Sequence, residues 1–361
     1  MSFRIWRTAL LLTAVGLLLG GCGFKDIDKR FFVVAMGIDL SDNKDKPYDV
    51  TLRLAVPAPK VGEGLAESQI EHQEAQSIAE AVRNLKAHVD KEIDFGHCRV
   101  FLFGDKLVKT HLQESLNWLA RRRDIQLISY VAVAEPTASK LLHGNPTTER
   151  LAGNSFFLTF GKEGTVSPFT VTSFLFDCFR RIKEKGMDPV IPIVRYDGDS
   201  YVVEKLSLLD KFHEKLVLTP EETQLYNMSA NEYKKSGIPI DYQGQRLALY
   251  VSNISSKMNI THDPIPTVQF SMNISGMVEQ GVLRLDPHEV ERKLSQHVSE
   301  SLEKLLAKIR DAGVDPYGFG LHYLAQYFGK ESDWKHWQEV YPEVKFQVNT
   351  SVKITHPGLI Y

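Results

Sequence analysis

The fold is set by an apolar run of strand length, Phe31-Phe32-Val33-Val34-Ala35-Met36-Gly37-Ile38-Asp39. A polar loop, residues 41–48, follows it. Apolar side chains then occupy every second position over residues 50–56, which is the period of a half-buried strand. The two segments therefore predict a β-hairpin, and Pro57 ends its second strand.

Helical and strand patterns alternate after this hairpin. Residues 74–91 carry apolar side chains at helical spacing, and residues 97–104 follow as a strand. A second helical pattern covers residues 107–119, and residues 125–134 give another strand. Because strands and helices alternate, we expect a mixed sheet with packed helices, an N-terminal mixed α/β domain over residues 22–190.

A small middle domain is expected over residues 191–240. Pro189 and Pro192 suggest a linker or a domain edge at its start. Short strand patterns then lead to a helix that begins at Thr219-Pro220-Glu221-Glu222. The threonine of this segment can cap the helix, its proline suits the first turn, and its second glutamate stands three residues after the cap.

The remaining residues, 241–361, are expected to form a C-terminal α+β domain. Residues 268–274 alternate as a strand does, and Asp286-Pro287-His288-Glu289 begins the longest helix, whose apolar stripe ends at Ile309. Residues 344–354 give a final strand. We therefore expect three antiparallel strands with one long helix here, and an α+β protein of three domains overall.

The first 21 residues have the shape of a signal peptide. Two arginines precede an uncharged run, Thr8 to Gly21, which is shorter than the ~18–20 apolar residues that a membrane-spanning helix needs. Leu19-Gly20-Gly21-Cys22 resembles the lipobox of bacterial lipoproteins, in which the cysteine sulfur receives a diacylglyceryl group. We predict a signal peptide over residues 1–21 and lipidation of Cys22, with fatty-acid chains such as palmitate. The alternative is an ordinary cleaved signal, in which Cys22 is incidental.

Composition excludes several classes of protein. The 361 residues are 43% hydrophobic and 24% charged, with a formal net charge of -2. These values do not fit a disordered, collagenous, coiled-coil or polytopic membrane protein, and they give no basic excess for nucleic acid. Cys98 and Cys178 would lie on the exported side, where a disulfide is possible. Both stand in apolar segments, which favours two buried free thiols.

The sequence carries no recognisable catalytic or metal-binding motif. Its 12 histidines include no His-Glu-x-x-His, and no Gly-x-Ser-x-Gly, Walker or Gly-x-Gly-x-x-Gly segment occurs. The segment from Asp39 resembles a calcium loop, but Lys44 stands at the glycine position and Val50 where a bidentate glutamate is required, so we interpret it as a solvated hairpin loop. A glycosidase-like carboxylate pair stays open. We predict no catalytic residue, no metal site, no cofactor and no enzymatic activity.

Several motifs, in order along almost the whole chain, are similar to those of one family. They are Cys22-Gly23-Phe24-Lys25-Asp26-Ile27, Met36-Gly37-Ile38-Asp39, Phe95-Gly96-His97-Cys98-Arg99-Val100, Asp188-Pro189-Val190-Ile191-Pro192 and Asp315-Pro316-Tyr317-Gly318-Phe319-Gly320. This series resembles the C-subunit lipoproteins of spore germinant receptors, the Ger(x)C family. A turn or packing role is expected for Gly37, Gly96 and His97 within these motifs.

The resemblance implies a three-domain α+β lipoprotein, anchored to the outer face of the spore's inner membrane. It implies two integral-membrane partner subunits and a role in triggering germination when nutrients such as amino acids or sugars arrive. The family supplies no catalytic residues, and direct binding of a small molecule stays open. Two alternatives to this function remain: a solute-binding lipoprotein of a transporter and, less favoured, a cell-wall hydrolase.

Overall fold

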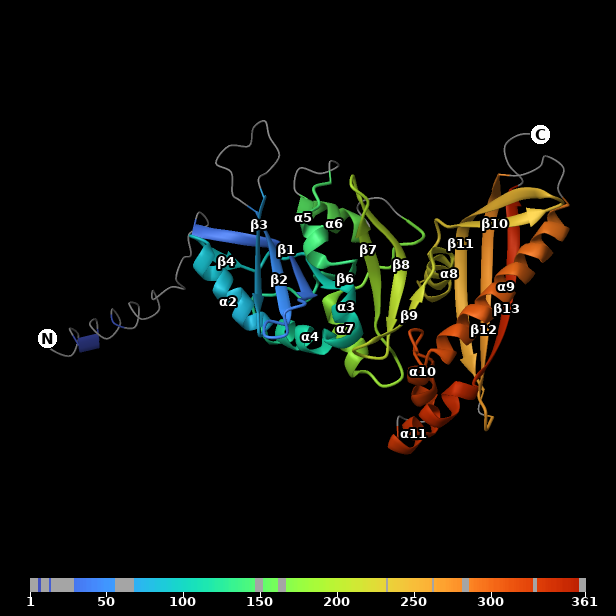
Figure 1. Ribbon diagram of the computed structural model, residues 1–361. Helices are drawn as coiled ribbons and strands as arrows, with labels where there is room; N and C mark the ends of the chain where they lie inside the picture. The colour runs from blue at the N-terminus through green and yellow to red at the C-terminus, as the bar shows by residue number, and fades with distance from the viewer. Residues whose placement is uncertain are drawn as a thin grey trace.

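The computed structural model describes residues 6, 7, 13, 29–55, 68–146, 152–161, 167–231, 233–261, 263–280, 286–326 and 330–356. Within them the strands form two sheets, one of nine strands and one of four (Figure 1). Helices pack on both sheets, so the expected α+β class is confirmed. No helix in this part of the chain combines the length and hydrophobicity needed to cross a bilayer.

The larger sheet has the strand order β3-β2-β1-β5-β6-β7-β8-β9, with β4 beside the start of β1. Its strands are β1 (Arg30–Leu40), β2 (Tyr48–Ala55), β3 (Ser68–Ala75), β4 (Glu92–Asp94), β5 (Val100–Gly104), β6 (Tyr130–Glu135), β7 (Val190–Tyr196), β8 (Tyr201–Leu209) and β9 (Glu214–Leu218). β1 pairs antiparallel with β2, so the predicted hairpin is confirmed. The calcium-like loop between them is exposed over residues 42–46.

The edge strand β3 departs from the sequence expectation, which placed the start of a helix at residue 74. β3 is mostly polar and half-buried, because it pairs with β2 on one side only. It therefore lacks the apolar alternation that predicted its neighbours. Helix α2 (Ile78–His88) begins after it, with the Ser77 hydroxyl accepting a hydrogen bond from the Glu80 N–H.

Helices cover both faces of the larger sheet. The cluster on one face includes α2, α3 (Asp105–Thr110), α4 (Leu112–Arg121) and α7 (Leu175–Lys183). The cluster on the other face includes α5 (Ala138–His143) and α6 (Ala152–Phe160). The expected single helix over residues 107–119 is two helices, α3 and α4, which meet at His111.

The smaller sheet has the strand order β10-β11-β12-β13. Its elements are β10 (Gly237–Tyr242), β11 (Gln245–Ile260), β12 (Thr267–Gln280), α9 (Pro287–Asp311), α10 (Phe319–Gln326), α11 (Glu331–Val340), the short 3-10 helix η2 (Tyr341–Glu343) and β13 (Lys345–His356). β13 runs parallel to β12, so the expectation of antiparallel strands was wrong for the last strand. The reason is the long helix between them, which returns the chain to the end of the sheet where β12 began.

Side chains of α9 cover the free edge of β13. Four of them, one per turn of the helix, accept hydrogen bonds from alternate backbone N–H groups of the strand. The pairs are Glu303 with Val348 at 2.9 Å, Ser299 with Thr350 at 3.0 Å, Ser295 with Val352 at 2.9 Å and Glu291 with Ile354 at 2.8 Å. The helix thus satisfies donors that an uncovered edge strand would present to other chains.

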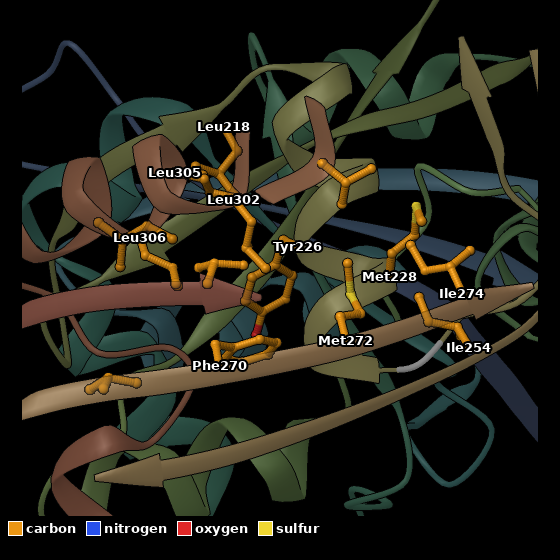
Figure 2. Packing of buried hydrophobic residues seen from close by; sticks show 14 of the residues in the cluster. Leu218, Tyr226, Met228, Ile254, Phe270, Met272, Ile274, Leu302, Leu305 and Leu306 are labelled. Carbon is orange, nitrogen blue, oxygen red and sulfur yellow. The ribbon is translucent and has the colours of Figure 1, made fainter. Parts of the chain in front are cut away.

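The segment over residues 191–240 is divided between the two sheets. β7, β8 and β9 extend the larger sheet, whereas α8 (Pro220–Asn231) joins the core of the smaller one. Figure 2 shows Tyr226 and Met228 of α8 among Phe270 and Met272 of β12 and leucines of α9. We call the nine-stranded sheet with its helices the N-terminal half, and the four-stranded sheet with α8–α11 the C-terminal half. The boundaries of the three expected domains stay a prediction.

Two predicted helix starts are confirmed. At the start of α8 the Thr219 hydroxyl accepts from the Glu222 N–H at 3.3 Å, and the Glu222 carboxylate accepts from the Thr219 N–H at 2.9 Å. At the start of α9 the Asp286 carboxylate accepts from the His288 N–H at 3.0 Å. Local sequence therefore determines where both helices begin.

Candidate functional site at the junction of the two halves

Two of the proline-containing motifs, far apart in the sequence, meet between the halves. Asp188 precedes β7 and Asp315 follows α9, 127 residues later. The Asp188 N–H donates to the Asp315 carbonyl oxygen at 2.8 Å. In return, the Asp315 N–H donates to the Asp188 carboxylate at 2.7 Å. This reciprocal pair joins the loop between α7 and β7 to the loop between α9 and α10.

The Asp315 carboxylate organises the start of α10. Its two oxygens accept from the N–H groups of Gly318, Phe319 and Gly320 at 2.7–2.9 Å. The side chain is buried, with 4% of its surface exposed, and this burial raises the pKa of Asp315 from 3.8 to about 7 against the opposing effect of the three donors. Because its oxygens already face backbone donors, the carboxylate has a structural role.

Two cations of the N-terminal half tie the junction together. The Lys211 ammonium lies 2.5–2.8 Å from the carbonyl oxygens of Arg181, Glu184 and Met187 and 3.0 Å from the Asp188 carboxylate. The Arg181 guanidinium donates to the carbonyl oxygen of Asp188 at 3.1 Å. It also donates across the junction to the carbonyl oxygen of Pro316 at 3.0 Å. The positive charges therefore compensate carbonyl oxygens from both halves.

Glycines allow the two backbones to approach closely. Gly186 has a φ of +71°, and a Cβ atom built there would lie 2.3 Å from the Gly320 carbonyl carbon. The Gly186 carbonyl oxygen accepts from the Leu321 N–H at 2.9 Å. A Cβ on Gly320 would lie 2.5 Å from Trp337 Nε1. The junction therefore has no room for a side chain at either position.

A pocket of about 360 Å³ opens beside this junction. Its polar lining includes Arg181, Ser229, Lys257, Tyr317 and His322, and no acidic side chain is among its lining residues. The hydroxyls of Ser229 and Tyr317 share a hydrogen bond of 2.8 Å. The volume and the basic lining suit a small polar or anionic molecule.

A second hollow, of about 420 Å³, lies between α8, β10 and α9. Its walls include Leu225, Met228, Ile238 and Leu305, and glutamates and lysines stand around them. The Lys308 ammonium and the Glu222 carboxylate at its rim are 2.7 Å apart. This hollow is the more apolar of the two, and none of its lining residues belongs to the motifs that meet at Asp188.

Comparison with known families gives two matches, which meet within the last strands of the larger sheet. Residues 23–196 match the model described as the spore germination protein N-terminal domain. Residues 207–358 match the model described as spore germination B3/GerAC like, C-terminal. The chain belongs to this spore germination family. The two matches together span both sides of the junction.

Individual relatives of the spore germination family align over most of the chain. Spore germination protein GerQC of Bacillus cereus is 20% identical over 84% of this chain and 87% of its own length. Spore germination protein B3 of Bacillus subtilis (strain 168) is 20% identical over 95% and 96%. The crystal structure of the GerBC protein has a TM-score of 0.56 at 17% identity, covering 89% of this chain and 97% of GerBC. The chain therefore has the fold of GerBC over most of its length.

The predicted lipidation residue, Cys22, lies outside the described residues. Cys98 and Cys178 are both free and buried, in agreement with the interpretation as buried thiols. Burial raises the pKa of the Cys98 thiol far above its ordinary value and that of Cys178 to about 12. Thiols of this kind are unreactive at neutral pH. In the described part of the chain no three His, Cys, Asp or Glu side chains form a metal-binding group.

The matched residues at the end of β1 have a packing role. A Cβ on Gly37 would lie 2.7 Å from the Ala138 Cβ, so the strand and α5 are in close contact there. The Asp39 carboxylate accepts from the N–H groups of Ala138 and Ser139 at 2.8 Å. Burial raises its pKa to about 6. Of the other matches, the Gly96 N–H donates to the Asp94 carboxylate at 2.8 Å.

Both junction motifs are recognisable in the sequence, but the contact between them was not predicted. Lys211 was missed, because a lone lysine between two strand patterns carries no signal of its contacts. Its backbone φ of +124° is one that side chains rarely adopt, and this is visible only in the folded chain.

Proposed function

We propose that the protein is the membrane-anchored C subunit of a nutrient germinant receptor. In this proposal a diacylglyceryl group on Cys22 holds it on the outer face of the spore's inner membrane, and it acts in a complex with integral-membrane subunits. The observation that carries the proposal is the match of both spore germination models, over residues 23–196 and 207–358. The sequence Leu19-Gly20-Gly21-Cys22 supports the anchor.

An anchor of this kind has a clear physical purpose. Two acyl chains, at ~0.8 kcal/mol per buried CH₂, hold a folded domain stably on a bilayer. Confinement to the membrane raises the effective concentration of the subunit near its membrane partners, so modest interfaces suffice. The junction also supports a role in a complex, because its hydrogen bonds connect the two halves. A subunit whose halves are connected in this way can contact one membrane partner through each half.

The two alternatives from the sequence are less well supported. A solute-binding lipoprotein usually has two similar lobes, whereas the two sheets of the described residues differ, with nine strands in one and four in the other. A hydrolase needs an accessible carboxylate with a raised pKa. The pKa is also raised for Asp49 and Glu214, but the two carboxyl groups with the largest rises, Asp315 and Asp39, are buried and accept hydrogen bonds from backbone N–H groups.

Affinity purification tests the proposal directly. The tagged full-length protein is isolated from detergent-solubilised spore membranes, and two polytopic membrane proteins are expected to accompany it. Labelling with a radioactive fatty acid should mark the wild-type chain. The Cys22→Ala variant, as the matched control, should lose the label. A wild-type chain that is purified without membrane proteins would contradict the complex, and a labelled Cys22→Ala variant would contradict the anchor.

A further inference from the structure

Three large apolar side chains are exposed together on the N-terminal half. The exposed fractions are 49% for Leu127, 59% for Ile128 and 45% for Phe176. The Phe176 N–H donates to the Leu127 carbonyl oxygen at 2.9 Å, so the loop before β6 and the start of α7 are adjacent. The Phe176 ring also stacks on that of Phe174, 5.5 Å away. We call Leu127, Ile128 and Phe176 the apolar patch.

The apolar patch lies at the edge of the sheet where the parallel strands begin. β1, β5 and β6 are parallel neighbours, so their amino ends share one edge. Hydrogen bonds connect the loops there in sequence: the Tyr130 N–H donates to the Arg99 carbonyl oxygen at 2.8 Å, and the Arg99 N–H donates to that of Val34 at 3.1 Å. The patch is therefore at the end of the sheet from which β1 starts.

Basic side chains accompany the apolar patch. Arg99 and Arg123 are exposed, and neither forms an ion pair within the described residues; the Arg99 guanidinium lies over the Phe157 ring, 5.6 Å from its centroid. Arg122 pairs with Asp124, and Arg180, one helical turn after Phe176, pairs with Asp177 at 2.7 Å. Four arginines thus stand against two aspartates, which leaves a positive surface next to exposed apolar side chains.

The chain before β1 limits how far this edge can lie from the proposed anchor. Eight residue intervals separate Cys22 from Arg30, the first residue of β1. A fully extended chain of that length spans at most ~29 Å. If Cys22 is lipidated, Arg30 is therefore held within ~29 Å of the bilayer surface, and the apolar patch lies toward the same end of the sheet.

We propose that the apolar patch rests in the membrane interface, with Arg99 and Arg123 facing the phosphates of anionic lipids. This inference depends on the lipid anchor of the proposed function. Leucine, isoleucine and phenylalanine next to arginine are the side chains that interfacial segments combine, the first group in the acyl boundary and the second at the headgroups. The acyl chains give the attachment, and the patch gives the subunit one orientation on the membrane.

A fluorescent reporter on the lipidated full-length chain tests this orientation. Ile128→Cys carries an environment-sensitive fluorophore, while the native thiols of Cys98 and Cys178 stay protected by burial. The control is Ile265→Cys, at an apolar position with 38% exposure in the loop between β11 and β12. Both proteins are reconstituted in vesicles of phosphatidylcholine, without and with phosphatidylglycerol.

We expect the fluorophore at residue 128 to show a blue shift of its emission, and this shift should be larger in vesicles that contain phosphatidylglycerol. The fluorophore at residue 265 should show no shift. Substituting Arg99→Glu and Arg123→Glu together should remove the dependence on the anionic lipid. A chain that floats with vesicles but keeps the reporter in water overturns this inference and leaves the anchor intact. A chain that does not float contradicts the anchor itself. A blue shift that requires co-purified membrane proteins would assign the apolar patch to a protein interface instead.

Discussion

Asp188 and Asp315 hold each other's backbone, with two hydrogen bonds of 2.8 Å and 2.7 Å between loops 127 residues apart in the sequence. The Asp188 carboxylate accepts one of these two bonds, whereas the Asp315 carboxylate accepts hydrogen bonds from N–H groups of its own loop. Removing one of these carboxylates therefore tests how strongly the two halves depend on their junction.

Asp315→Asn should destabilise the protein. The amide keeps one oxygen, so one of the buried donors at Gly318, Phe319 and Gly320 faces an NH₂ group. A buried donor left unsatisfied costs about 1–3 kcal/mol. Urea unfolding of the purified chain at about pH 4 measures this loss, because ionisation of the buried wild-type carboxyl at higher pH would reduce the difference between the two proteins. Asp241→Asn is the control, because that side chain is 77% exposed. Equal stability of the two variants would contradict the role of Asp315.

The contribution of Asp315 should also depend on pH. Its pKa is 3.8 ordinarily and about 7 in the folded chain. Between these values the folded chain keeps a proton that the unfolded chain releases, so rising pH favours unfolding. The stability of the wild type relative to Asp315→Asn should fall by at most about 1.4 kcal/mol per pH unit across this window. Unfolding at a series of pH values measures it. A difference that grows with pH would mean that folding favours the ionised carboxylate.

Gly186→Ala should be more harmful than an alanine at a glycine of similar backbone conformation. Gly186 has a φ of +71° and Gly244 a φ of +77°. An added Cβ meets nothing within 4 Å at Gly244 but lies 2.3 Å from the Gly320 backbone at Gly186. Gly244→Ala should therefore cost only the left-handed strain, about 1–2 kcal/mol. Gly186→Ala should exceed it by a further ~1–3 kcal/mol, because the junction must open. Thermal unfolding of both variants gives the comparison, and equal losses would contradict the close contact.

How much of the molecule could be predicted from the sequence depended on the range of the interactions. Short-range signals succeeded: Thr219 and Asp286 cap their helices as expected. Signals that depend on pairing failed. β3 is polar because it lies at an edge, and the direction of β13 depends on where α9 delivers the chain.

The junction could be predicted only in part for the same reason. Its motifs around Asp188 and Asp315 were recognised as resemblances, whereas their contact is made across 127 residues. Lys211 has no local pattern at all, and its partners are carbonyl oxygens, which every sequence contains. Residues such as Leu127 and Ile128 also give no warning, since an apolar pair in a sequence is ordinarily buried.

Ser299→Ala tests whether α9 protects the edge of β13. Its hydroxyl accepts from the Thr350 N–H at 3.0 Å, and Thr350 is buried with 6% of its surface exposed. Loss of that acceptor should cost about 1–3 kcal/mol, although alanine has the better helix propensity by about 0.5 kcal/mol.

Ser301→Ala is the matched control, because Ser301 stands on the same helix and lines the hollow beside α8. It should leave stability unchanged or raise it slightly. Hydrogen exchange reports the change at the strand itself: the Thr350 amide should lose protection in Ser299→Ala and keep it in Ser301→Ala. Unchanged protection in both would mean that the neighbouring acceptors Ser295 and Glu303 hold the strand without Ser299. Within the four-stranded sheet as described, β13 pairs with β12 alone, so its other edge has no strand partner. We therefore expect each of these side-chain acceptors to cover part of that edge, which could otherwise pair with a strand of another chain.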